Sequence, residues 1–262
     1  MLAGIVKKKN IMDMQATHTA WYADLLQQQS PVPQLCARWQ ASFAAQLPPA
    51  ACSAQGTALL HAGLGPFWPV GRETLLLDAA FAAPCTAQEL EDFRPPAARV
   101  ALLPPASLRR AALAAGAVCR RAELLRVMDN NGVTALRETL GEDARLFALR
   151  HGAAFAAHAA LWHTALPEAL HRWLAALPLP HSAAACGWLA ILACASAGGR
   201  GILTRLRCLL AELEQSARAG GPAAPLDSLP DAAAAGAWPL VRVIIRKTCP
   251  QPSEYTWEQL FA

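Results

Sequence analysis

The chain has 262 residues, of which 54% are hydrophobic and 16% are charged. This composition excludes wholesale disorder, because a chain of this length with so much apolar surface can bury a full core. The net charge of +4 is modest for the length and does not indicate a dedicated nucleic-acid-binding protein, so we expect no nucleic-acid partner.

The eight cysteines are scattered along the chain, and none forms a C-x-x-C pair. Several lie inside apolar helical patterns, which is typical of reduced, buried thiols in a cytosolic protein. A disulfide framework is the alternative, and the length of the chain disfavours it. The N-terminus carries its lysines after a very short apolar start, the wrong order for a signal peptide.

Residues 1–95 are predicted to form an N-terminal helical lobe that contains an irregular segment rich in proline and glycine. Helical patterns occupy residues 16–47, and residues 48–70 show little regular signal. Residues 74–77 fit a short strand or the start of a helix. Arg94, Pro95 and Pro96 mark the boundary with the central region.

Residues 96–215 are predicted to form the central helical core, with three helices between Leu102 and Trp162. The first begins near Pro104 and Pro105, carries its apolar face through Leu125, and ends at residues 129–132. The second is a short apolar stripe that Gly141 closes. Glu142 and Asp143 suit the positive end of the third helix, whose apolar residues are Leu146, Phe147, Phe155 and Leu161.

Further helices are predicted at residues 167–177, 183–199 and 202–215. The second of these is apolar enough to raise the alternative of a membrane-associated segment, although a buried helix explains its alanines and terminal glycines. Residues 216–262 are predicted to comprise an Ala/Gly/Pro linker, a short β-branched strand at 240–246 and an aromatic tail. The fold class expected is mainly α, a single compact multi-helix domain with minor β.

The seven histidines raise the question of a metal site. His151 and His158 are seven residues apart and can share a helix face, whereas His158 and His163 point apart. No H-E-x-x-H motif is present, and no carboxylate lies at ligand spacing. We therefore predict no metal, no cofactor and no catalytic residues. The alternative is a metal-dependent or small-molecule-binding enzyme that uses the segment from His151 to His171.

Two arginine pairs lie about three helical turns apart, so a continuous helix would place both on one face. These residues and a nearby arginine are Arg109, Arg110, Arg120, Arg121 and Arg126. One interpretation is a solvated face whose charges find partners one turn away. The other is a docking face for an acidic protein partner, because guanidinium groups suit carboxylate recognition.

The C-terminal tail carries an apolar cluster composed of Tyr255, Trp257, Leu260 and Phe261. These side chains can fold back on the core, which is the common outcome for so many aromatic residues. Alternatively, they can form a short anchor that inserts into a groove of a partner.

The central region resembles the SctK family (YscK/PscK-like), the sorting-platform accessory proteins of bacterial type III secretion systems. The resemblance covers residues 67–165. It rests on L-P-P-A-S-L-R-R from Leu103, A-A-G-A from Ala114, and A-L-R-E-T-L-G-E-D-A-R-L-F-A-L-R from Ala135 to Arg150.

The resemblance implies a cytosolic, mainly helical, non-enzymatic adaptor of the injectisome, peripheral to the inner membrane through the secretion apparatus. Such a protein links the SctD-like inner-membrane ring protein to the pods of SctQ-like protein, which carry the SctL-like stalk. Direct membrane insertion is not expected.

Overall fold

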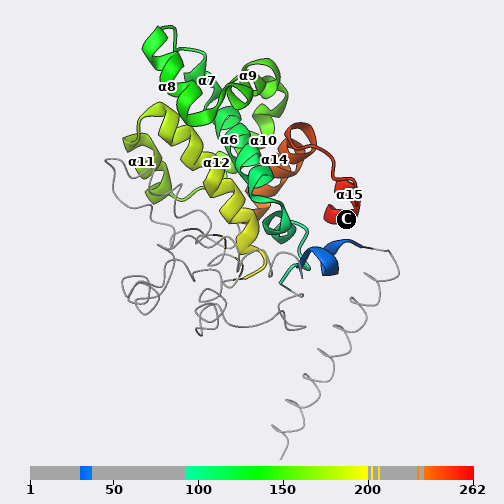
Figure 1. Ribbon diagram of the computed structural model, residues 1–262. Coiled ribbons are helices and arrows are strands. Elements are labelled where there is room, and N and C mark those ends of the chain that lie inside the picture. Colours follow the sequence, from blue (N-terminus) through cyan, green and yellow to red (C-terminus); the bar gives the residue numbers. More distant parts are fainter. Residues whose placement is uncertain (1–29, 37–91, 200–201, 203–205, 207–228, 230–232) are drawn as a thin grey trace, which may run out of the picture.

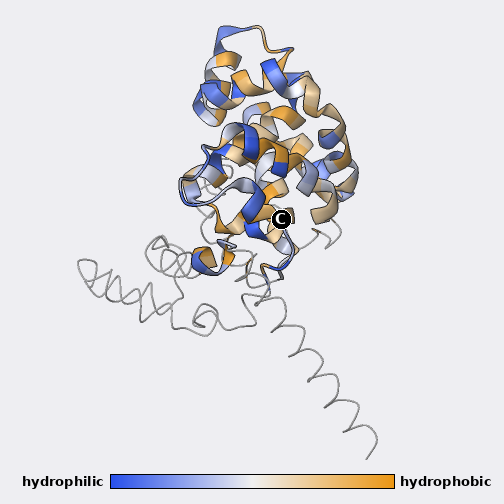
Figure 2. Cartoon of the chain, turned by 90° about the vertical axis from the view of Figure 1, so that its right-hand side faces the viewer, coloured by the Kyte–Doolittle hydropathy of each residue, from blue (hydrophilic) through white to orange (hydrophobic). Residues whose placement is uncertain are grey.

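All regular secondary structure in the described part of the chain is helical, in agreement with the mainly α fold class predicted. The computed structural model describes residues 30–36, 92–199, 202, 206, 229 and 233–262. Within these residues no strand is present. The helices form a bundle in which apolar turns lie between neighbours and hydrophilic turns face outward (Figures 1 and 2).

Helices α6 (Pro105–Cys119) and α12 (Leu179–Ser196) lie side by side at the centre of the bundle (Figure 1). Each begins with a proline in its first turn, where the missing N–H costs no hydrogen bond. By length and composition α12 could cross a membrane, yet 67% of its apolar window is buried inside the fold. The prediction of a buried helix in this segment is therefore confirmed.

The contact between α6 and α12 depends on small residues. A Cβ atom added to Gly116 would overlap the carbonyl oxygen of Ala183, and one added to Gly187 would overlap that of Ala112. Only hydrogen fits at either position, so the two backbones approach more closely than ordinary side chains allow. This explains why the A-A-G-A segment lies in the middle of α6.

The first predicted helix is shorter than expected. It ends at Cys119, and Arg120 leaves the helical region before a single turn, α7 (Arg121–Leu124). The shift in register leaves Leu125 45% exposed, contrary to its predicted place on the apolar face.

Residues 129–132 begin a helix, and the prediction that they end one was wrong. The carboxylate of Asp129 accepts a hydrogen bond of 2.6 Å from the backbone N–H of Gly132 and caps α8 (Asn130–Leu140). Gly141 then ends α8 as predicted. Its φ of 79° and ψ of 152° suit glycine, and this backbone conformation redirects the chain into the next helix.

The third predicted helix is broken into α9 (Glu142–His151), a 3-10 turn η5 (Gly152–Phe155) and α10 (Ala156–Ala165). The turn stacks Phe155 on Phe147, with ring centroids 5.8 Å apart. It also leaves Leu161 54% exposed, so this residue is not part of the core as predicted. Helix α11 (Glu168–Ala176) agrees with the helix predicted at 167–177.

The strand predicted at residues 240–246 is wrong, because this segment belongs to helix α14 (Ala233–Thr248). Its β-branched residues favour a strand in isolation, but its buried residues recur at the helical spacing. These are Ala237, Leu240, Val241, Ile244 and Ile245. They pack in the same core as α6 and α12, which shows tertiary packing overriding local propensity.

Helix α15 (Trp257–Phe261) closes the fold beside the 3-10 helix η4 (Ala98–Leu102) (Figure 1). Arg99 joins the two, and its side chain is only 5% exposed. Its guanidinium donates hydrogen bonds to the backbone carbonyls of Phe93, Arg94, Leu260 and Ala262 at 2.9–3.2 Å. Burial lowers the pKa of Arg99, and these carbonyls satisfy its donors.

Other predictions fall largely outside the described residues. They concern the N-terminal lobe apart from residues 30–36 and 92–95, the strand at 74–77, the helix at 202–215, and the linker up to residue 232. In the described part of the lobe, residues 32–36 are helical, and Val32, Leu35 and Cys36 are buried in the core.

Candidate functional site

An open groove of about 720 Å³ lies between α6, α9 and the C-terminal end of α14. Its apolar lining includes Leu113, Leu140 and Phe147. Three cationic side chains, Arg109, Arg110 and Lys247, are exposed around it. A groove with apolar side chains and several fixed cations suits an elongated partner that carries both apolar and acidic residues.

The carboxylate of Glu142, which also lines the groove, is already neutralised by the protein. Arg145 donates to it at 2.8 and 2.9 Å, and Arg137 donates at 3.0 Å. These hydrogen bonds, that of Arg145 first, lower the pKa of Glu142 to about 2. The remaining carboxylate, Asp143, lies in the first turn of α9, where the helix dipole favours it. The cations are therefore in excess at the groove.

The predicted arginine face is divided by the break at Arg120. Arg109 and Arg110 line the groove, and the Nη1 of Arg110 lies 3.5 Å from the carbonyl oxygen of Thr248. Arg120 instead forms an ion pair with Glu123 at 3.4 Å. The prediction that these arginines share one face assumed one continuous helix, but the helix ends at Cys119 and α7 follows after Arg120.

Arg121 is used inside the fold. Its Nε donates a hydrogen bond of 3.2 Å to the carbonyl oxygen of Ala148, and its side chain packs against Gly152. Arg126 is exposed and does not line the groove. Of the five predicted arginines, Arg109 and Arg110 are therefore the two that line this groove.

The aromatic tail folds back on the core, which was one of its two predicted interpretations. Tyr255, Trp257, Leu260 and Phe261 are each at most 8% exposed. The hydroxyl of Thr256 caps α15, and Gln259 completes the capping box. In this structure these side chains are not available as an anchor for a partner.

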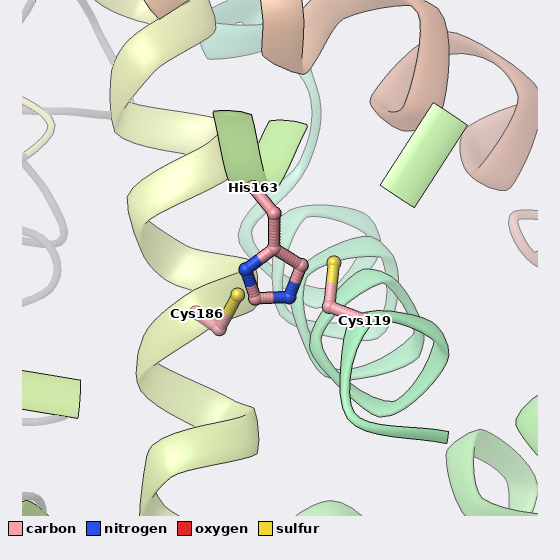
Figure 3. A group of neighbouring side chains, drawn as sticks. All are labelled: Cys119, His163 and Cys186. Carbon is pink, nitrogen blue, oxygen red and sulfur yellow. The ribbon is translucent and has the colours of Figure 1, made fainter. Parts of the chain in front are cut away.

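The histidines do not form the site that their spacing suggested. His151 is exposed at the end of α9 beside Phe147, whereas His158 lies on the next helix, α10. His163 stacks on His171, with ring centroids 5.8 Å apart. His163 also lies beside two cysteines, Cys119 and Cys186, which sequence spacing did not connect with it (Figure 3).

Lys247 was not predicted as a site residue, because a strand at 240–246 and an aromatic tail were expected in this region. The apolar side of the groove was also not predicted, since Leu113, Leu140 and Phe147 come from three different helices. The signal that was present is the helical period of residues 237–248, which places Lys247 at the exposed end of α14.

Comparison of the chain with protein-family models, curated proteins and solved structures found no match.

Proposed function

We propose that this chain is a non-enzymatic cytosolic adaptor of a bacterial type III secretion system, with a role like that of SctK. The resemblance of residues 67–165 supports the family. The groove supports the mode of action, because it offers cations beside apolar side chains and a volume suited to a peptide segment. In this proposal the chain links a SctD-like inner-membrane ring protein to SctQ-like pods and contacts the SctL-like stalk indirectly.

The observation that carries the proposal is the placement of Arg109, Arg110 and Lys247 around one groove. Three exposed cations in this arrangement attract an acidic segment and fix its register, whereas the apolar side chains contribute buried area. The occupant we propose is an acidic, partly apolar segment of one of these secretion proteins. This adaptor role requires no enzymatic step in the groove.

The test is capture of partners from the native cytosol by the tagged full-length chain, with identification by mass spectrometry. The variant Arg109→Glu with Arg110→Glu should recover at least tenfold less SctQ-like or SctD-like protein, because each cation now repels the acidic segment. Arg126→Glu is the matched control, since Arg126 is exposed but lies outside the groove.

Two results would contradict the proposal. Recovery of none of the SctQ-, SctD- or SctL-like proteins from cells that express a secretion apparatus would remove the adaptor role. Equal recovery by the wild type and the double variant, with both folded, would keep the role and remove the groove as its docking surface.

A further inference from the structure

Three side chains with affinity for soft metals meet where three helices come together. Cys119 is the last residue of α6, His163 lies in α10, and Cys186 lies in α12. One ligand atom from each lies within 4.8 Å of the other two. The imidazole of His163 lies between the two cysteine side chains (Figure 3). Within the described residues no other trio of histidine, cysteine or acidic side chains is so arranged.

The distances are close to those of a metal centre. In a tetrahedral zinc site with Zn–S of about 2.3 Å and Zn–N of about 2.0 Å, neighbouring ligand atoms lie roughly 3.5–3.8 Å apart. The three atoms lie within 4.8 Å of one another, so each pair needs to close by about 1.3 Å at most. Changes of side-chain rotamer can supply such a movement without displacing the helices.

The thiols of Cys119 and Cys186 lie in contact with each other, so their surroundings differ from those of the other buried thiol on α12. A hydrogen bond with the Cys119 thiol lowers the pKa of Cys186, whereas the same contact and burial raise the pKa of Cys119. Burial lowers the pKa of His163. Cys194, on the same helix as Cys186, has its pKa raised by burial alone. Cys186 is thus set apart from a neighbouring buried thiol by its surroundings.

A buried hydrogen-bond donor lies beside the trio. The indole N–H of Trp162 is buried and forms no hydrogen bond of good geometry with the described residues. The ring lies close enough to Cys186 to lower the pKa of that thiol further. A metal-bound thiolate accepts such an N–H bond better than a neutral thiol does, and ligand sulfurs and nitrogens commonly have outer partners of this kind.

We propose that Cys119, His163 and Cys186 bind one zinc ion. Two thiolates cancel the charge of Zn²⁺, so the bound site is electrically neutral in its buried position. Binding releases the two thiol protons to solvent, and neutral imidazole supplies the third ligand. Cys119 and His163 are only partly buried, so the fourth position faces the more open side and takes a water molecule.

The expected consequence is structural. The ion joins the end of α6 to α10 and α12, and it stabilises the native state because the unfolded chain does not hold the three ligands together. This role does not depend on the proposed adaptor function. Loss of zinc binding would leave the groove test unaffected, and failure of the groove test would leave this site standing.

The experiment is titration of the reduced, metal-free, full-length chain with Co²⁺, followed by displacement with Zn²⁺. One equivalent of Co²⁺ should give thiolate charge-transfer absorption and the visible bands of a tetrahedral site, and Zn²⁺ should abolish both. Cys186→Ala and His163→Ala should each weaken zinc affinity at least tenfold, as measured by competition with a chromophoric chelator. Cys194→Ala is the matched control and should bind as the wild type does.

Thermal unfolding provides a second readout. Zinc should raise the Tm of the wild type and of Cys194→Ala, but not that of His163→Ala. If Cys186→Ala does not fold, the partly exposed positions provide Cys119→Ser and His163→Gln for the same titration. Unchanged affinity in folded variants of the trio would overturn the proposal. So would recovery of Cys119 and Cys186 as a disulfide, without metal, from cells lysed in a thiol-trapping reagent.

Discussion

The two sides of α6 contrast sharply. On one side the backbone at Ala112 and Gly116 lies so close to α12 that a Cβ atom added to Gly116 or Gly187 would overlap the facing backbone. On the other side Arg109 and Arg110 are exposed at an open groove. The first side fixes the position of the helix, and the second side remains free for contacts outside the chain. Stability and recognition should therefore respond to different substitutions on the same helix.

The largest effect is expected from Gly187→Leu. The new side chain would collide with the backbone of α6 at Ala112, so the two central helices would have to separate. We expect a loss of about 3 kcal/mol or more in the free energy of unfolding, measured by urea denaturation. Ala160→Leu is the control, because Ala160 is exposed on α10 and should tolerate the same gain in size. A change below about 1 kcal/mol would show that the close contact is not required.

Arg99→Ala tests a buried polar contact, the hydrogen bonds that join η4 to the C-terminal tail. The substitution leaves buried carbonyl groups without their donor, and we expect a loss of about 2–3 kcal/mol. The tail should loosen, since Leu260 and Ala262 lose their link to η4. Red-shifted tryptophan emission and faster proteolysis near Trp257 would report this. Emission and cleavage identical to the wild type would contradict the assigned role.

Gly141→Ala tests the junction that directs α9 along the groove. Its φ of 79° with ψ of 152° disfavours any side chain, and we expect a cost of roughly 1–2 kcal/mol. Nothing lies within 4 Å of the added Cβ, so the effect comes from the backbone alone. Thermal unfolding measures it. An unchanged Tm would show that the junction accommodates an ordinary residue by a change of backbone angles.

The double variant Arg109→Glu with Arg110→Glu should change the free energy of unfolding by no more than about 0.5 kcal/mol. Both side chains are exposed, and the hydrogen bond from Arg110 to the carbonyl oxygen of Thr248 is long, at 3.5 Å. Circular dichroism and urea denaturation measure this directly. A large loss of stability would mean that the groove side of α6 also holds the fold, and the contrast between its two sides would disappear.

The smallest effect concerns pH. Because its folded pKa is depressed, ionised Glu142 stabilises the fold above its ordinary value of 4.5, and this contribution is lost as the pH falls toward about 2. The side chain of Glu142 is 40% exposed, so solvent screening keeps the effect small. The wild type should lose more stability than Glu142→Gln over this range of pH, as urea denaturation at several pH values would detect. Parallel pH profiles would show that the ion pairs with Arg137 and Arg145 are not significant in solution.

Local signals predicted much of the helical framework. Pro104 and Pro105 at the start of α6, Gly141 after α8 and the apolar period of α11 all act within a few residues, so the sequence shows them directly. The helix at 233–248 was not predicted, because its β-branched residues favour a strand until tertiary packing is considered. The break at Arg120 also escaped prediction, since the helical period continues through it.

The candidate sites depend on tertiary structure to different degrees. Arg109 and Arg110 were predicted from a pattern within one helix. Cys119, His163 and Cys186 could not be connected, because each lies on a different helix and no fixed spacing relates them. The histidine-rich segment from His151 to His171 contains His163 but neither of the two cysteines.

The hydrogen bonds of Arg99 link the closure of the core to the synthesis of the C-terminal residues. They join η4 to Leu260 and Ala262, and helix α15 contributes buried Trp257, Leu260 and Phe261 to the same core as η4, α6 and α12. Residues 257–262 must therefore leave the ribosome before this core can close. Until then α6 and α12 are exposed with their apolar faces incomplete, so the nascent chain should be a strong client for chaperones that bind apolar segments.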